Sequence, residues 1–477
     1  MVDGTARLVL AELLFPVTAL ITISFLTRQL GPQAYGVLVL SLTAIIWIES
    51  AITSFFSKAT IKFVGEMTDW CPAGSMIARL SLGVGIAAMV LVWLLATPLS
   101  VLLNVPDLAF YLRVAALDIP PFCLGQAYRS ALIGSGNYQG GAVARAGRWL
   151  TRMCLMLVLV QTGFSITGAL LGVIGGSIAE MWLGRRYLGV TIFRNHTRVA
   201  LPIRRYGGLL FLSSVSIIIC NGMDLFMLKI LGGTATAAGI YSAAQSLALL
   251  PSLFSWTFSS LLLATLSRHI ARNQRNHAKE LVRDAMRITL LFIPVAAIIA
   301  GAAPEIVEVF FGPAFIPAGS LLSLLIIGSI ANVMFTLALT VMTADGHPAR
   351  TVFFTAPFIP LALAGHLAMI PRFGQFGAAL VTVGVSSLIA CVAVASISIP
   401  WKVWPPLGTF LRSLVIALAL GAAAMLWPTP GLFVFMKLIA LGMVGFLSYW
   451  WIGEFCKEEI AAVRSLLMLK TGEVKVA

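Results

Sequence analysis

The sequence predicts an all-α polytopic membrane protein with about fourteen transmembrane helices, arranged as two six-helix bundles plus two C-terminal helices. Composition is the first reason: 59% of the 477 residues are apolar and only 10% are charged, whereas a soluble domain carries about 25% charged residues. A soluble fold of this length could not bury so much apolar surface. The composition therefore excludes a soluble enzyme, a secreted domain and a disordered scaffold.

The second reason is the pattern of apolar stretches. A transmembrane helix needs about 20 predominantly apolar residues, and charged residues, glycine and proline divide this chain into stretches of roughly that length. Because lipid offers no hydrogen-bond partner to the backbone, segments that cross it must be helical. In chain order, the predicted spans are residues 8–28, 36–57, 76–96, 109–132, 143–162, 166–184, 206–230, 237–266, 285–303, 318–341, 351–371, 376–399, 408–427 and 431–452.

An internal repeat is the third reason. Similar short motifs lie at the ends of the first and seventh spans and at the starts of the helices that follow them. Another pair of similar motifs lies further along each half. The pairs occur in the same order, and the two members of each pair are separated by a nearly constant number of residues. The matching segments are RQLG at 28–31 and KILG at 229–232, YG at 35–36 and GIY at 239–241, and GAL at 168–170 and GAA at 377–379.

The repeat predicts two co-oriented halves, 1–184 and 206–399, joined by a basic cytoplasmic linker at 185–205. Two further helices within 400–452 and a cytoplasmic amphipathic tail at 453–477 are predicted to follow. Transporters built from two parallel halves place their substrate between the halves and alternate access by rocking them. The repeat therefore predicts a transporter.

The distribution of Lys and Arg predicts the orientation. With a cytosolic N-terminus, few of the 32 Lys and Arg residues fall at the outer side of the membrane, as the positive-inside rule requires: Arg28, Arg113, Lys229, Arg372 and Lys437. Both termini are therefore predicted to be cytoplasmic, and the basic stretch 268–287 is predicted to form a helix lying on the inner leaflet. Anionic head groups account for the net charge of +14, so no nucleic-acid partner is expected.

Several turn and packing motifs carry a family resemblance. They are LGPQAYG at 30–36, KFVGE at 62–66, GIYSAA at 239–244, FFGPAF at 310–315 and IPRFGQFGAA at 370–379. In these segments the chain resembles the polysaccharide transporter family, the oligosaccharide flippases of the multidrug/oligosaccharidyl-lipid/polysaccharide exporter superfamily. The resemblance implies a V-shaped pair of bundles around a cavity, a place in the bacterial cytoplasmic (inner) membrane, and an undecaprenyl-diphosphate-linked oligosaccharide as substrate.

Two repeat-equivalent cations are candidate binding residues for such a diphosphate. An unpaired charge inside a bilayer is costly, so Lys and Arg that face the cavity are the first groups to seek. Arg28 and Lys229 lie at the outer ends of the first and seventh spans and could hold the diphosphate at the outer mouth. The alternative is that each caps its helix C-terminus and extends to the interface.

A row of arginines at the inner start of the fifth span forms a second candidate site. Arg145, Arg148 and Arg152 share one helical face, and Arg129 at the inner end of the fourth span is close to them in sequence. Arginine forks suit phosphate oxygens, so these four residues could gather the diphosphate from the cytosolic leaflet. Ordinary anchoring at the inner leaflet is the alternative.

Three acids inside predicted spans and two mid-span tryptophans complete the candidate site. Glu49, Asp118 and Asp224 are candidates to exchange a proton or bind Na⁺, because ionisable groups at this depth need a partner or a wet cavity; structural hydrogen bonding is the alternative. Trp47 and Trp256 occupy equivalent places in the second and eighth spans. Each could stack on a sugar ring, with buried packing as the alternative.

An enzyme is not expected. Membrane glycosyl- and acyltransferases need catalytic acids or a histidine reached from water, but the longest predicted outer loop, 303–317, offers Glu305 and Glu308 without a metal motif or a nucleophile–base pair. The six cysteines lack paired spacing, so neither a disulfide framework nor a metal site or cofactor is predicted.

The predicted function is that of a flippase, which translocates a lipid diphosphate-linked oligosaccharide by alternating access for export of a cell-surface polysaccharide such as a lipopolysaccharide or exopolysaccharide. Membrane lipids, H⁺ or Na⁺, and the polymerase or export machinery are the expected further partners. Two alternatives stay open. One is a multidrug/cation antiporter of the same superfamily, which would favour an acidic, aromatic cavity, and the other is a peptidoglycan lipid-precursor flippase.

Overall fold

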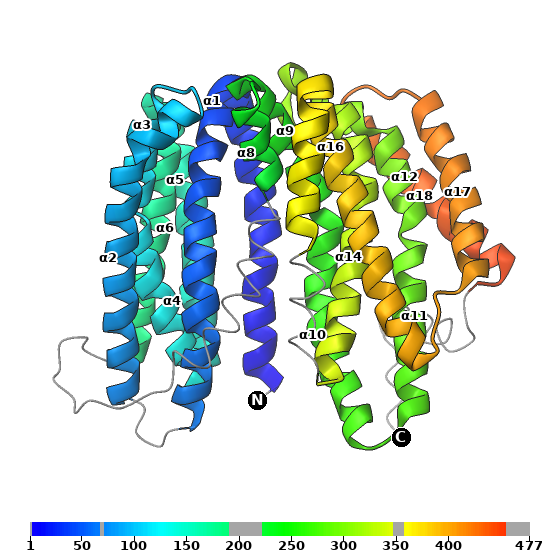
Figure 1. Cartoon of the computed structure of the whole chain (residues 1–477), viewed down its shortest axis with the longest axis horizontal. Helices are drawn as coiled ribbons and strands as arrows, with labels where there is room; N and C mark the ends of the chain where they lie inside the picture. The colour runs from blue at the N-terminus through cyan, green and yellow to red at the C-terminus, as the bar shows by residue number, and fades with distance from the viewer. Residues whose placement is uncertain (1, 67–70, 190–221, 347–356, 455–477) are drawn as a thin grey trace, which may run out of the picture.

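The computed structural model describes residues 2–66, 71–189, 222–346 and 357–454, and every regular element in these ranges is a helix (Figure 1). The first elements are α1 (Val2–Glu66), α2 (Cys71–Leu102), α3 (Leu108–Ala116), α4 (Ile119–Gly134), α5 (Tyr138–Leu159), the π-helix η1 (Val160–Phe164) and α6 (Ser165–Leu188). The later ones are α8 (Met223–Ile230), α9 (Ala235–Ala248), α10 (Leu250–Ala271), α11 (Arg275–Leu291), α12 (Ile293–Gly301), α13 (Ala303–Phe311), the 3₁₀-helix η2 (Pro313–Phe315), α14 (Ala318–Ala344), α16 (Phe358–Trp401), α17 (Leu407–Leu426) and α18 (Phe433–Ile452).

Within the described ranges, nine helical stretches are long and apolar enough to cross a membrane. Three of these stretches contain a non-helical glycine at which the chain reverses: Gly31 in α1 with φ 70°, Gly163 in η1 with φ 97°, and Gly374 in α16 with φ 55°. Glycine reaches such positive φ values because it has no Cβ. Figure 1 shows the chain running in opposite directions on either side, so each stretch holds two predicted spans.

These helices confirm the predicted all-α polytopic membrane fold. The total of about fourteen spans stays a prediction, because parts of the spans predicted at 206–230 and 351–371 lie outside the described residues. The predicted linker 185–205 and tail 453–477 also lie largely outside them, so the predicted domain boundaries stay predictions.

Figure 1 shows two groups of helices side by side, α1 to α6 and α8 to α18. Helix α1 connects them, because it packs on α4 and α5 in its own group and on α9 and α13 in the other. We call the end of the molecule where α1 reverses the Gly31 end, and the opposite end, where the chain begins, the N-terminal end.

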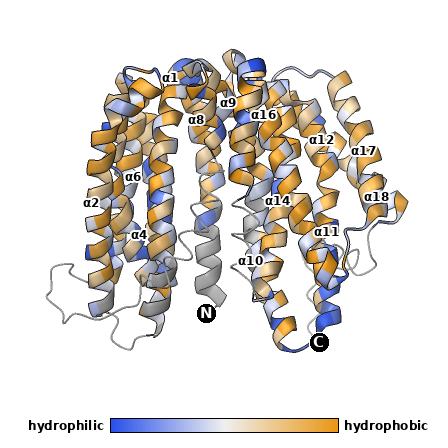
Figure 2. Ribbon diagram, viewed as in Figure 1, coloured by the Kyte–Doolittle hydropathy of each residue, from blue (hydrophilic) through white to orange (hydrophobic). Residues whose placement is uncertain are grey.

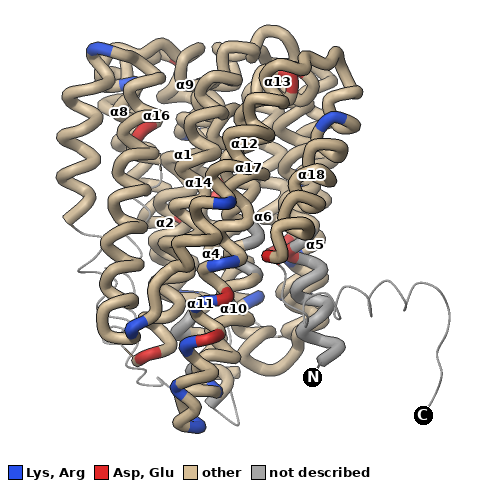
Figure 3. The backbone as a smooth tube through the Cα atoms, turned by 90° about the vertical axis from the view of Figure 1, so that its right-hand side faces the viewer, with Lys and Arg blue, Asp and Glu red and all other residues tan. Residues whose placement is uncertain are grey.

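The outward faces of the helices are apolar, as Figure 2 shows for α2, α17 and α18. Leu426 and Trp451, for example, are 83% and 91% exposed. Such exposure is unfavourable in water but suits a lipid surrounding. In Figure 3, most of the Lys and Arg positions in view lie in the half of the molecule that contains the N-terminus. The predicted orientation requires this asymmetry, although the side that faces the cytoplasm stays a prediction.

Ion pairs join helices α17 and α18 to each other and to the other helices of the second group. At the Gly31 end, the buried Lys437 donates to both oxygens of Glu305 at 2.8 Å, and Thr429 donates to Glu305 Oε2 at 2.8 Å. At the N-terminal end, Arg412 Nη1 and Thr409 of α17 donate to the carboxylate of Glu454, which directly follows α18, with 2.7 Å between Arg412 Nη1 and Glu454 Oε2. Arg287 Nη1 of α11 donates to the Glu454 carbonyl at 3.4 Å. Ion pairs with these additional hydrogen bonds hold their geometry better than isolated surface pairs do.

The prediction of one helix lying on the inner leaflet over 268–287 is wrong. Helix α10 continues to Ala271, the chain turns at Arg272 to Gln274, and α11 begins at Arg275. Asn273 adopts φ 60° in this turn, a left-handed conformation that asparagine tolerates better than most residues. The basic residues therefore belong to the adjoining ends of two helices. The helical spacing of these residues in the sequence does not reveal the turn between the helices.

Candidate functional site

A cluster of buried and half-buried charges lies between α1, α4, α5 and α6. We call it the arginine cluster; its members are Arg129, Arg145, Arg148, Arg152, Glu12, Glu49, Asp118 and Glu180. Glu180 is fully buried and lies at its centre. Its Oε2 accepts a hydrogen bond from Arg148 Nη1 at 3.1 Å, and its Oε1 lies 3.3 Å from Arg129 Nε. All four arginines are predicted candidates, whereas Glu180 and Glu12 are not.

Close packing of α5 against α6 brings these charges together. A Cβ added at Gly176 would lie 2.8 Å from Arg152 Cβ and 3.0 Å from the Arg148 carbonyl oxygen, so the two backbones nearly touch there. Glu180 follows Gly176 by four residues and therefore lies on the same face of α6. The shared face of α5 that carries Arg148 and Arg152 thus meets the carboxylate of α6.

Aromatic rings cover the guanidinium groups. Arg148 lies 4.4 Å from the Phe122 ring centroid, and Arg145 lies 4.7 Å from the Trp149 ring centroid. Cation–π contacts of this kind stabilise a cation more strongly when water is excluded. Arg148 Nε is buried and has no hydrogen-bond partner among the described residues. The cluster therefore retains a donor that could bind an anionic group.

Two predicted ion-coupling residues also belong to the cluster. Asp118 is 1% exposed, and neither of its carboxylate oxygens has a hydrogen-bond partner within the described ranges. Glu49 lies beside Asp118, and its Oε2 is 4.0 Å from Arg148 Nη2. Two neighbouring carboxyl groups in a dry interior disfavour a second negative charge. Glu49 and Asp118 therefore form an acidic pair beside Arg148.

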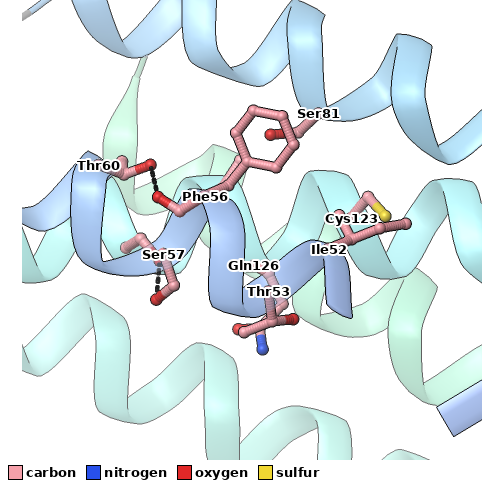
Figure 4. A pocket seen from close by; sticks show the side chains of 10 residues that line it. Ile52, Thr53, Phe56, Ser57, Thr60, Ser81, Cys123 and Gln126 are labelled. Carbon is pink, nitrogen blue, oxygen red and sulfur yellow. Dashed lines mark hydrogen bonds between the residues drawn. The ribbon is translucent and has the colours of Figure 1, made fainter. Parts of the chain in front are cut away.

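A small polar pocket adjoins the arginine cluster (Figure 4). It lies between α1, α2 and α4 and has about 10 Å³ of space for a water-sized molecule, which is room for about one water. Its polar lining includes Thr53, Ser57, Ser81 and Gln126. The hydroxyls of Thr53 and Ser81 have no hydrogen-bond partner in the described part of the chain. Gln126 Oε1 accepts a hydrogen bond from Arg129 Nε at 2.8 Å. The pocket is thus linked to the cluster by a direct hydrogen bond.

The third acidic candidate, Asp224, lies in the second helix group. It is 3% exposed, and its Oδ2 accepts hydrogen bonds from Tyr241 at 2.6 Å, Thr382 at 3.2 Å and Gln245 at 3.2 Å. Its Oδ1 accepts the backbone N–H of Leu225 at 2.9 Å. These donors come from α8, α9 and α16, so the carboxylate joins two consecutive helices to a third that is far along the chain.

A larger cavity opens beside Asp224. It has about 1050 Å³ of empty volume, part of it open to the outside, and it is lined by α8, α9, α10, α14 and α16. Asp224 and His366 lie in its wall. His366 is 3% exposed, and its Nδ1 has no hydrogen-bond partner among the described residues. Sequence reasoning misses His366 because its neighbours in space lie far along the chain.

Arg28 and Lys229, the two repeat-equivalent cations, make different contacts at the Gly31 end. Arg28 is exposed; its Nε donates to the carbonyl of Phe310 at 3.2 Å, and its Nη2 donates to that of Val309. Lys229 is mostly buried, and its Nζ donates to the Gly233 carbonyl at 2.9 Å, just beyond the end of α8. Arg28 therefore connects the two helix groups, whereas Lys229 makes the kind of contact that helix capping requires.

The two mid-span tryptophans are described to different extents. Trp47 is half-buried, and its ring centroid lies 4.8 Å from that of Phe226 in the other helix group. A Cβ added at Gly222 would lie 3.2 Å from Trp47 Nε1, so Trp47 touches the wall of the larger cavity. Trp256 lies in α10, and its side chain is outside the described residues.

Comparison with solved structures identifies the fold. The chain is similar to lipid II flippase MurJ in an inward closed conformation, with a TM-score of 0.75 and 15% identity over 93% of this chain and 98% of that one. It is also similar to an inward-facing multidrug resistance MATE family transporter of the MOP superfamily, with a TM-score of 0.65 and 14% identity over 87% and 99%. The chain is also similar to a MOP superfamily transporter from Pyrococcus furiosus, described as having a binding pocket of reverse polarity, with a TM-score of 0.57 and 14% identity over 86% and 96%.

The class of protein is therefore a polytopic membrane protein with the MurJ- and MATE-like transporter fold. At these identities the likeness establishes the fold alone. Residues 25–319 match the family model described as polysaccharide biosynthesis protein, and the chain belongs to this family. The predicted family resemblance is confirmed. No curated protein sequence matched the chain.

Proposed function

We propose that the protein is a flippase rather than an enzyme, and that it moves a lipid diphosphate-linked oligosaccharide across the bacterial cytoplasmic membrane. Undecaprenyl diphosphate is the proposed carrier, and export of a cell-surface polysaccharide is the proposed purpose. The arginine cluster is the observation that carries this proposal. Buried guanidinium groups inside a membrane protein suit an anionic cargo, and the family match supports a glycan.

The arginine cluster also disfavours the cation antiporter. A cationic drug would meet Arg129, Arg145, Arg148 and Arg152 along with the carboxylates, and like charges repel strongly in a dry interior. The overall likeness to a lipid II flippase instead favours a second candidate, a peptidoglycan lipid precursor. Both candidates are diphosphate-linked lipids, so the arginine cluster serves either.

Loss of the gene is the test that separates these candidates. A deletion strain is expected to accumulate an undecaprenyl-diphosphate-linked glycan on the cytosolic side and to lose the surface polysaccharide. Accumulation of a peptidoglycan precursor followed by lysis would identify the second candidate. If neither lipid accumulates and the gene instead restores resistance to cationic dyes, the flippase proposal is wrong.

Arg152 offers the cleanest test of diphosphate binding, because it is in the arginine cluster and Arg148 rather than Arg152 pairs directly with Glu180. Arg152→Gln is expected to lower export about 10- to 100-fold, since a hydrogen bond to a charged group contributes about 1.5–3 kcal/mol. Complementation of the deletion strain, corrected for the amount of protein in the membrane, measures this change. The matched control is Arg186→Gln, an exposed arginine that also lies over a tryptophan, Trp182. Equal export by both variants would contradict a role for Arg152.

We further propose that Glu49, Asp118 or Asp224 carries a coupling ion, H⁺ or Na⁺. When Glu49 carries H⁺, arginines outnumber ionised carboxylates in the cluster, which favours binding of the diphosphate. Release of the proton returns the arginines to the carboxylates and favours release of the cargo.

Reconstituted vesicles with an imposed H⁺ or Na⁺ gradient test this coupling. Glu49→Gln, Asp118→Asn and Asp224→Asn are measured one at a time, and the residue that carries the ion is identified by loss of gradient dependence. Unaltered dependence on both gradients in all three variants would reject the coupling proposal without affecting the proposed cargo.

A further inference from the structure

Resting on the proposed function, we propose that the larger cavity in the second helix group is a subsite for the sugar part of the cargo. It would bind neutral, polyhydroxylated rings, while the arginine cluster of the first group binds the diphosphate. The lipid-linked glycan would thus be divided between the two groups according to its chemistry.

The cavity has the size and the unsatisfied polar groups of a ligand site. The space in it that a water-sized molecule can occupy is about 140 Å³, which is enough for about one ring-sized group. His366 Nδ1 and Ser252 Oγ lie in its wall, are buried, and have no hydrogen-bond partners among the described residues. A buried polar atom without a partner costs about 1–3 kcal/mol, so His366 and Ser252 retain hydrogen-bonding capacity that a ligand or water in the cavity could satisfy.

The charge of the described lining disfavours the diphosphate as the occupant. Among the described residues that line the cavity, none is a Lys or an Arg. Its carboxylate, Asp224, already accepts hydrogen bonds from Tyr241, Gln245 and Thr382. A diphosphate placed here would meet a negative charge without a compensating cation, which is strongly unfavourable in a dry interior.

The remaining polar groups suit sugar hydroxyls. The cavity presents the amide groups of Gln245 and Asn332 and the hydroxyls of Ser252, Ser329 and Ser386. Amides and hydroxyls both donate and accept hydrogen bonds, as sugar hydroxyls do. Phe335 adds an apolar surface on which the C–H face of a sugar ring could pack. Such a mixed lining resembles a binding site more than a core, because a core of this size would be filled by side chains.

The cavity also lies at the right place for a divided cargo. Gly222 lines it and lies against Trp47 of α1, the helix that carries Glu49 of the arginine cluster. One wall of the cavity is therefore close to the boundary between the two helix groups. A glycan in the cavity and a diphosphate at the cluster would approach the same stretch of α1 from opposite sides.

Alkylation of an introduced cysteine tests this subsite. Ser386→Cys is made in full-length protein whose native cysteines are replaced by serine, and its rate of reaction with N-ethylmaleimide is measured. The first probe is the undecaprenyl-diphosphate-linked oligosaccharide extracted from the deletion strain, and the second is undecaprenyl diphosphate without sugar. At a concentration tenfold above its dissociation constant, the first probe is expected to slow the reaction about tenfold. The second probe is expected to leave the rate unchanged.

A matched cysteine and two further variants complete the experiment. Ser320→Cys lies exposed on α14, away from the cavity lining, and neither probe should protect it. Asn332→Ala and His366→Ala are each expected to weaken protection by the first probe while preserving the thermal stabilisation of the protein by the second.

Three outcomes would overturn the subsite. Equal protection of Ser386→Cys by both probes would show that the cavity takes the diphosphate or the lipid chain. Thermal stabilisation by both probes without protection by either would place the glycan elsewhere, and the proposed function would survive. If neither probe stabilises the protein, the proposed function fails together with the subsite.

Discussion

Replacing Gly239 by leucine is expected to force the two helix groups apart at the Gly31 end and to reduce export severely. Helices α1 and α9 cross there with their backbones in contact. A Cβ added at Gly239 would overlap the Pro32 carbonyl oxygen and lie 3.0 Å from the backbone nitrogen of Gly36. Because these neighbours are backbone atoms rather than flexible side chains, a leucine can be accommodated only if the helices separate.

The expected size of this effect follows from packing energetics. Overpacking a close contact costs about 3 kcal/mol at the upper end of the usual range. If only the state closed at the Gly31 end bears this cost, the equilibrium between conformations shifts about 100-fold away from that state. Pulsed electron paramagnetic resonance measures the change as a longer distance between spin labels at Leu102 and Leu432, exposed residues near the Gly31 end of the two groups.

Gly384→Leu is the matched control, because a Cβ at Gly384 would meet nothing within 4 Å. Gly36→Leu should reproduce the effect of Gly239→Leu, since a Cβ at Gly36 would overlap the Ala235 carbonyl oxygen. The two substitutions act on one contact, so their combination should be less than additive. An unchanged label distance in Gly239→Leu would show that this crossing does not control closure.

Glu180→Ala is expected to give the largest loss of stability. It leaves Arg129, Arg145 and Arg148 without the fully buried carboxylate around which they gather. Breaking a buried ion pair by removing one partner costs about 3–5 kcal/mol, and three arginines share this partner. Unfolding in mixed micelles of a mild detergent and dodecyl sulfate, followed by circular dichroism, measures the change.

A surface carboxylate provides the comparison for Glu180. Glu280 is exposed and contacts only the exposed His277 among the ion pairs described for it, so Glu280→Ala should change the free energy of unfolding by less than about 1 kcal/mol. Replacing Arg148 and Glu180 together by methionine should recover part of the loss, because a well-packed apolar pair avoids burying an unpaired charge. Equal stability of Glu180→Ala and Glu280→Ala would refute a central role for Glu180.

The fold could be predicted because the membrane leaves few choices. Composition and span length determine helices when the surrounding lipid cannot satisfy the backbone, and glycines such as Gly31 and Gly374 mark reversals between spans. The structure of the basic stretch around Arg272 was harder to predict. Its basic residues recur at helical spacing on both sides of a turn, and the turn itself consists of only three residues.

The candidate site could be predicted only in part. The face shared by Arg145, Arg148 and Arg152 follows from helical periodicity. Glu180 could also have been predicted from the sequence, because it is an acidic residue inside the predicted span 166–184 and comes four residues after Gly176. The hydrogen-bond partners of Asp224 could not be predicted in the same way. Thr382 is 158 residues from Asp224, and local sequence does not encode which helices meet in space.

The two ion pairs of α17 and α18 have a mechanical consequence. Because Arg412 joins α17 to Glu454 at the end of α18, and Lys437 of α18 is held by Glu305 of α13, we expect this helix pair to move with the rest of the second group as one rigid body in the proposed rocking motion. The second group thus presents a wider surface to the lipid acyl chains than the first group does. A change in bilayer thickness or tension should therefore exert different forces on the two groups. We expect the rate of transport to depend on the lipid composition of the membrane, even if no lipid contacts the cargo.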